Sequence, residues 1–197
     1  MAMTKTFEQL WAEAFPQKNP IPHLFKHYFA KHWFRIHSLP ESKRYAETKA
    51  ESELILKRHN QIISECFPNK IPIFIVTGSY LFGDEDNSIY DFKNILSYNF
   101  NYLPKIKLSE TDPTVFDDSD TYYRSQYYKT NWEPHLFNDL LSKIANDEVK
   151  AFFISFEKSI IVAPYDGGID FIIWDDTMRA RLQEKYRDWL SPRADRL

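Results

Sequence analysis

The sequence predicts an α+β fold with a mainly antiparallel sheet, and three features lead to this class. Short apolar runs separated by turn residues over 150–174 are typical of a β-meander. An amphipathic pattern over 42–67 predicts one long helix. The chain has 197 residues, of which 43% are hydrophobic, and this suits one domain with its own core. We therefore expect a single domain over 1–197, with helices packed on one face of the sheet and a helical segment over 1–30.

In the N-terminal half, apolar residues spaced three to four apart predict helices, and runs of β-branched or aromatic residues predict strands. Pro68 ends the longest of these helices. In chain order we expect helices over 4–15 and 24–29, a strand over 33–37, the long helix over 42–67, a buried strand over 71–76 and a polar turn over 83–87.

The C-terminal half shows its clearest pattern after residue 150, where a meander and a terminal helix are expected over 150–190. Asp175 or Asp176 is a suitable N-cap for that helix. Residues 88–108 fit either a short helix or a strand. The other expected elements are an acidic surface loop over 110–120, a strand over 121–129, a helix over 134–145, and meander strands over 151–156, 159–165 and 169–174.

Charge is distributed unevenly along the chain, although the net charge is only −3. Residues 1–70 hold 11 basic and 7 acidic side chains, residues 71–149 hold 6 and 13, and residues 150–197 hold 8 of each. Binding to nucleic acid depends on basic side chains, so the acidic middle third argues against it. Such a stretch is better suited to a basic protein, a cation or water.

Cys66 is the only cysteine, which excludes an intrachain disulfide. No apolar run approaches the ~18 residues of a membrane span. The polar, amphipathic N-terminus does not have the pattern of a signal peptide. We therefore expect a cytoplasmic protein with no membrane partner.

The most informative stretch runs from Pro164 to Asp170, because it holds two of the four glycines, Gly167 and Gly168. Asp166 and Gly167 match a type I′ hairpin turn, in which both central residues need positive φ. Asp166 and Asp170 together are an alternative cation site, but hard cations usually take more oxygen ligands than two carboxylates. The turn is favoured, and Asp170 is less well explained because strand interiors disfavour aspartate.

Gly78 and Ser79 follow the expected strand over 71–76, as a Gly-Ser pair follows a strand in nucleotidyltransferases. That signature needs two carboxylates, one residue apart, to bind magnesium further along the chain. Asp91 stands at a suitable distance, but Lys93 occupies the second position, so the carboxylate pair is broken. The acidic residues over 84–86 fall in the expected turn.

The other reactive residues form no complete pattern. His23 and His27 share one helical face, whereas a zinc site needs three or four ligands. Cys66 lies on the apolar face of the long helix, where cysteine usually acts as a small hydrophobic residue. Ser79 lacks the elbow sequence of a serine hydrolase. We therefore assign no catalytic residue, no metal and no cofactor.

A group of aromatic residues occupies the expected strand over 121–129 and the residues after it. Its side chains suit a protein interface, a stacking surface for bases or one half-buried face of a strand. The acidic loop directly before it disfavours nucleic acid. The candidate interface comprises Tyr122, Tyr123, Tyr127, Tyr128 and Trp132.

The segment over 151–189 resembles a bacterial family of unknown function, DUF3885. The family shows two strands, a Tyr-Asp turn with glycine, an apolar strand with an aspartate, and a helix that ends in a Tyr-x-x-Trp-like motif, here Tyr186 to Trp189. The order of the upstream elements also agrees, so the resemblance spans 30–190. Many members carry Asp-Asp-Arg-Gly at the turn where this chain has Asp-Gly-Gly, so an arginine partner for the aspartate is missing here. The resemblance implies a bacterial origin and, because some members lie beside toxin genes, an immunity role.

We expect a non-enzymatic protein-binding module of this immunity type, with a basic protein as its partner. The alternative is a magnesium-dependent enzyme, nucleotidyltransferase-like or a hydrolase, that uses Asp166 and Asp170 or the Gly78–Ser79 region. Such an enzyme would bring these residues together with other acids or histidine in a concave site. A purely structural subunit is a third possibility, and the sequence assigns neither the ligand nor the oligomeric state.

Overall fold

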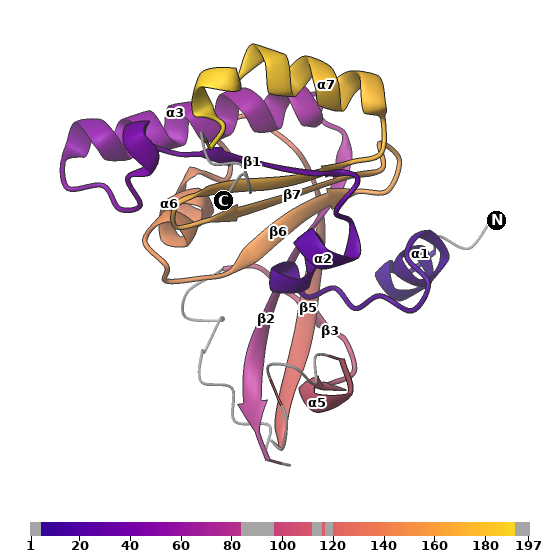
Figure 1. Ribbon diagram of the computed structural model, residues 1–197. Coiled ribbons are helices and arrows are strands. Elements are labelled where there is room, and N and C mark those ends of the chain that lie inside the picture. The colour runs from indigo at the N-terminus through magenta and orange to yellow at the C-terminus, as the bar shows by residue number, and fades with distance from the viewer. Residues whose placement is uncertain (1–4, 84–96, 112–115, 117–119, 192–197) are drawn as a thin grey trace.

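The computed structural model describes residues 5–83, 97–111, 116 and 120–191. Its centre is an antiparallel sheet with the strand order β1-β8-β7-β6-β2-β5-β3, in which β4 also pairs with β5 (Figure 1). The expected α+β class is therefore confirmed. The strands are β1 (Trp33–His37), β2 (Pro72–Phe82), β3 (Asn101–Tyr102), β4 (Ile106–Lys107), β5 (Thr121–Asn131), β6 (Ala151–Ser155), β7 (Ile160–Tyr165) and β8 (Gly168–Ile173).

Helices pack on both faces of this sheet. The longer helices after residue 30 lie on one face, as the sequence predicts, whereas the N-terminal helical segment covers the opposite face. None of the described helices is both long and apolar enough to pass through a membrane. The helices are α1 (Phe7–Ala14), α2 (Phe25–Tyr28), α3 (Lys49–Cys66), α5 (Leu108–Thr111), α6 (Asn138–Ala145) and α7 (Asp176–Lys185), with short 3-10 turns η1 (Pro22–Leu24), η2 (Pro40–Ser42) and η3 (Arg187–Trp189).

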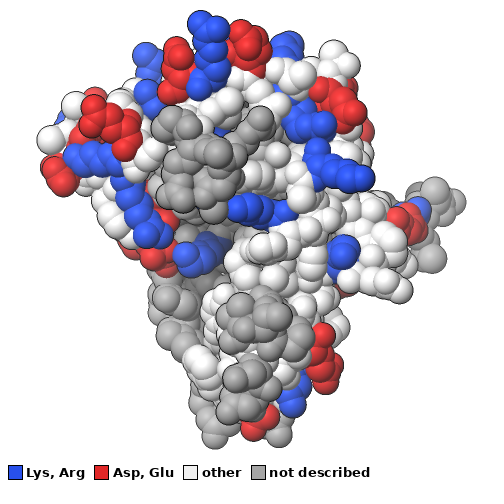
Figure 2. Space-filling view, viewed as in Figure 1, with Lys and Arg blue, Asp and Glu red and all other residues white. Residues whose placement is uncertain are grey.

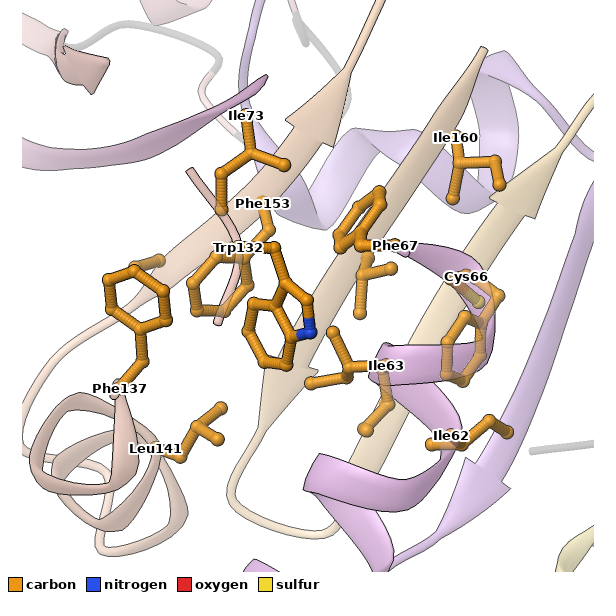
Figure 3. Packing of buried hydrophobic residues seen from close by; sticks show 14 of the residues in the cluster. Ile62, Ile63, Cys66, Phe67, Ile73, Trp132, Phe137, Leu141, Phe153 and Ile160 are labelled. Atoms are coloured by element: carbon orange, nitrogen blue, oxygen red, sulfur yellow. The ribbon is translucent and has the colours of Figure 1, made fainter. Parts of the chain in front are cut away.

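The larger core lies between the sheet and helices α3, α6 and α7. Its centre is Trp132, whose ring stacks on Phe137 at a centroid distance of 5.5 Å and meets Phe153 edge-on at 5.8 Å (Figure 3). Ile63 in α3 and Phe67 directly after that helix approach the same ring. On the opposite face a smaller core is built mainly from aromatic rings of the N-terminal segment and β2, so much of the aromatic content is packing.

The long helix α3 begins at Lys49 rather than near Ser42, because Thr48 and Glu51 form a capping box. Glu41 and Ser42 have φ values of 57° and 58°, in the left-handed region, which a right-handed helix cannot include. The segment over 43–48 is therefore free to run across the end of the β7–β8 hairpin, where its Arg44 and Tyr45 contact Asp166.

Strands β2 and β5 extend well past the rest of the sheet. β6 pairs with β2 only from Phe74 to Thr77, whereas β5 pairs with β2 along its whole length. Residues 78–82 and 121–125 thus form a projection, which we call the ribbon, at the bottom of the molecule in Figure 1, and β4 pairs with its β5 edge at Tyr122 and Tyr123. The expected strand over 71–76 was too short, because the small residues Gly78 and Ser79 do not end β2 but lie inside it.

Candidate functional site

Asp170 lies in β8 directly opposite Arg35 in the edge strand β1. The Arg35 guanidinium donates two hydrogen bonds to this carboxylate, from Nε at 2.6 Å and from Nη2 at 2.9 Å. Both side chains are mostly buried, with 19% and 14% of their surface exposed. Burial lowers the pKa of Arg35, but its hydrogen bonds and charge pairing with Asp170 outweigh this and raise the pKa overall. Asp170 is therefore the acidic half of a cross-strand ion pair.

Asp166 is the most deeply buried carboxylate of the hairpin, with 3% of its surface exposed. Arg44 Nε lies 2.5 Å from one carboxylate oxygen, and the Tyr45 hydroxyl donates to the same oxygen at 2.6 Å. Burial acts to raise the pKa of Asp166, but the hydrogen bonds from Arg44 and Tyr45 hold it below its ordinary value. The expectation that this aspartate lacks an arginine partner was wrong, since Arg44 supplies one from a distant part of the chain.

Gly167 and Gly168 are required by close packing rather than by the turn. Neither Asp166 nor Gly167 has positive φ, so the expected type I′ turn is absent although the hairpin forms. A Cβ on Gly168 would stand 2.0 Å from the carbonyl oxygen of Ile36, and one on Gly167 would stand 2.9 Å from the ring of Tyr165. Glycine therefore allows β1 to approach β8 and leaves room for the tyrosine ring.

Tyr165 lies close to both ion pairs. The Arg35 guanidinium sits 4.6 Å from the centre of its ring, a cation–π arrangement. Burial raises the pKa of Tyr165 to about 12, and the charges of Arg35, Asp170, Asp166 and Arg44 also act on its hydroxyl. The cluster pairs two carboxylates with two guanidinium groups, and this arrangement holds β1, the segment before α3 and the hairpin together.

These carboxylates are not presented to a cation. Each is engaged by an arginine, and within the described ranges no three His, Cys, Asp or Glu residues gather closely enough to hold a metal ion. Neither Asp166 nor Asp170 lines the cavity beside Gly78. The geometry thus does not assemble the magnesium site that the enzyme alternative requires at this hairpin.

Gly78 and Ser79 lie in the middle of β2, whereas the nucleotidyltransferase pattern needs them at the end of a strand. A Cβ on Gly78 would stand 2.5 Å from the Tyr123 side chain, so a glycine at this position leaves the space that the ring occupies. Beside them lies a cavity of about 330 Å³.

Asp91, Lys93 and the acidic residues over 84–86 fall outside the described residues. Most of the expected turn over 83–87 and most of the expected loop over 110–120 fall there too.

The aromatic group expected as one interface is divided among several environments. Trp132 is completely buried in the larger core, and Tyr123 lies in a third cluster with Leu108. Tyr127 stacks on Phe7 from one face of the sheet. From the opposite face, half-buried Tyr128 stacks on Tyr98 at 5.0 Å, and Tyr122 receives the Lys105 ammonium over its ring. The five residues do not form one continuous surface.

A buried polar pair joins Ser38 to His59, with 2.7 Å between the serine Oγ and the histidine Nε2. Burial lowers the pKa of His59 to about 3, so this ring is neutral at ordinary pH. Burial likewise raises the pKa of the Cys66 thiol. His23 lies in η1, with 3.3 Å between its Nδ1 and the Tyr80 hydroxyl, and His27 lies in α2.

The sequence reasoning missed Arg35, Arg44 and His59. A signal for Arg35 existed, because it and Asp170 are charged residues inside two apolar strands, where opposite charges often face each other. Arg44 and His59 carried no such signal, since their partners depend on how the segment before α3 and the helix itself lie on the sheet.

Comparison with known proteins gives one result. The model of a domain of unknown function, DUF3885, matches residues 21–194. No curated protein and no solved structure matches the chain. Because the match covers most of the sequence, this protein belongs to the DUF3885 family.

Proposed function

We propose that this protein is a non-enzymatic binding module of immunity type, acting in the bacterial cytoplasm on a basic protein partner. The observation that carries the proposal is the ribbon, which projects beyond β6, β7 and β8 from the acidic third of the chain. Phe82 at its tip and Tyr102 in the adjacent β3 expose 61% and 55% of their surfaces. Exposed aromatic residues suit a protein interface, and the acidic composition of residues 71–149 favours a positively charged partner.

The charge distribution supports the choice of partner. Residues 71–149 carry 13 acidic and 6 basic side chains, and Figure 2 shows acidic side chains together with basic ones at the margin of the lower end. On the same face, basic side chains gather across the middle of the molecule. A basic partner would thus be attracted to the ribbon end and repelled from the centre, which favours one orientation of binding.

The state of the reactive groups also favours binding over catalysis. Asp166 and Asp170 are each neutralised by an arginine, His59 is buried, and the Cys66 thiol is both buried and shifted away from the thiolate form. Catalytic groups usually combine a shifted pKa with access to a cleft. In these groups the shifted pKa or the burial results from packing inside the fold, and not from a position in a catalytic cleft.

The test is a calorimetric titration of the whole protein against basic proteins encoded beside its gene, including any toxin. We expect a partner to bind, with an affinity that falls as salt is added. The double variant Phe82→Ser/Tyr102→Ser should weaken binding about tenfold or more. Leu136→Ser is the matched control, because Leu136 is equally exposed at 57% but lies before α6, away from the ribbon.

Two results would overturn the proposal. One is that none of these proteins binds the folded chain. The other is binding that the ribbon variant leaves unchanged, because the partner would then use another surface.

A further inference from the structure

The cavity beside Gly78 has a volume of about 330 Å³ and mostly apolar walls. It lies where η1, the inner end of the ribbon and the loop before β6 meet. This size is within the range of binding pockets for small groups. Its lining residues are Pro22, His23, Gly78, Tyr80, Tyr123 and the loop over 147–150.

One wall of this cavity carries a hydroxyl that is unpaired among the described residues. Tyr123 is only 3% exposed, and within the described part of the chain its hydroxyl has no hydrogen-bond partner. The hydroxyl end lies against Gly78, where a Cβ would come within 2.5 Å of it. Tyr80 meets the Tyr123 ring edge-on at 5.3 Å, and its own hydroxyl is within 3.3 Å of His23. The wall thus offers aromatic surface and one free polar atom.

The mouth of the cavity carries a net negative charge. Lys150 and Asp147 neutralise each other, with 2.8 Å between the ammonium and the carboxylate. Glu148 accepts a hydrogen bond from the Asn146 amide at 3.1 Å, and no described lysine or arginine pairs with it. Among the described residues, one carboxylate at the mouth therefore lacks a counter-charge.

We propose that this cavity receives an arginine side chain of the basic partner, an inference that rests on the proposed function. A guanidinium is planar and stacks on tyrosine rings, and it has five N–H donors. It can donate to the Tyr123 hydroxyl inside and to the Glu148 carboxylate at the mouth, while its aliphatic stem lies along apolar residues such as Pro22. A lysine ammonium is more strongly hydrated and lacks the planar stacking surface, so arginine is the better fit.

The experiment is an NMR titration of the whole labelled protein with N-acetyl-arginine amide. The uncharged isostere N-acetyl-citrulline amide and the lysine derivative are titrated in parallel. We expect the arginine probe to bind with millimolar affinity and to shift the resonances of Gly78, Tyr80 and Lys150. Tyr123→Phe and Glu148→Gln should each weaken the probe about fivefold. Glu133→Gln is the matched control, since Glu133 is an exposed carboxylate outside the cavity, and it should leave binding unchanged.

Equal binding of the citrulline or lysine probe, failure of the arginine probe to bind, or normal binding by both cavity variants would each overturn the inference. The same two variants are then titrated with the protein partner. If both variants still bind the protein partner, the proposed function is supported and the inference about the arginine cavity is wrong. If the arginine probe binds but no basic protein does, the inference about the cavity is supported and the proposed function is wrong.

Discussion

Arg44 and Asp166 stand 122 residues apart in the sequence, and yet 2.5 Å separates the arginine Nε from a carboxylate oxygen of the aspartate. The arginine belongs to the segment that precedes α3, and the aspartate belongs to the turn between β7 and β8. Their contact fixes the approach to the longest helix against the end of the sheet.

Asp166→Asn should lower the free energy of unfolding by about 1 kcal/mol near neutral pH. The loss is modest because the Arg44 side chain is 63% exposed, and solvent screens its charge. The pKa of Asp166 is lower in the folded protein than its ordinary 3.8, so the carboxylate stabilises the fold above that value. The advantage disappears as the pH falls through the folded pKa. Urea unfolding of both proteins, near neutral pH and in acid, measures this, and an equal difference at both would contradict it.

Arg35→Lys should destabilise the protein by about 1–2 kcal/mol, although the charge is kept. Lysine cannot make the paired hydrogen bonds that Nε and Nη2 donate to Asp170, nor stack its head group on Tyr165 in the same way. A double-mutant cycle with Asp170→Asn measures the coupling between the two side chains. Additive effects of the two substitutions would show that the ion pair contributes no coupling energy.

Gly168→Ala should cost about 1–3 kcal/mol, because the new Cβ would stand 2.0 Å from the carbonyl oxygen of Ile36. Backbone atoms cannot rotate away as a side chain can, so β1 must move. The amide of Ser38, which donates to the Gly167 carbonyl at 3.0 Å, should then exchange its hydrogen faster.

Gly83→Ala is the control for this substitution. Gly83 has a positive φ of 70° but no described atom within 4 Å of its added Cβ, so alanine there should cost only about 1 kcal/mol and leave Ser38 exchange unchanged. A smaller loss at Gly168 than at Gly83 would refute the steric argument.

His59→Gln should flatten the pH dependence of stability in mild acid. The folded state keeps His59 neutral down to a pKa of about 3, whereas in the unfolded chain it takes up a proton near 6.5. Between these values the unfolded state binds more protons, so stability rises with pH by up to about 1.4 kcal/mol per pH unit from this residue. Ser38→Ala, which removes the hydrogen bond but keeps the histidine, should retain the slope. Identical slopes in the wild type and His59→Gln would contradict the prediction.

Local patterns were sufficient to predict the meander and the long helix. The strands over 151–156, 159–165 and 169–174 nearly coincide with β6, β7 and β8, because each combines apolar residues with bounding turn residues. The start of helix α3 was predicted seven residues too early. The residues before Thr48 are compatible with a helix, but the capping box at Thr48 fixes the first turn at Lys49.

Contacts between segments that are distant in the sequence could not be predicted from such local patterns. Gly78 and Ser79 look like the end of a strand, but pairing with β5 continues β2 to Phe82, and the glycine leaves room for Tyr123. The arginine partners of Asp166 and Asp170 depend on which strands are neighbours. That order comes from the packing of the whole chain and not from the residues beside the aspartates.

The pairing of β1 with β8 also has a consequence for synthesis on the ribosome. The partners Arg35 and Asp170 are 135 residues apart, so the first strand emerges long before the strand that it pairs with. Until then, Phe34 and Ile36, which end up almost completely buried, have no sheet to join. A nascent chain must therefore keep this strand unpaired until translation has passed β8, and during that interval it is exposed to aggregation and to chaperones.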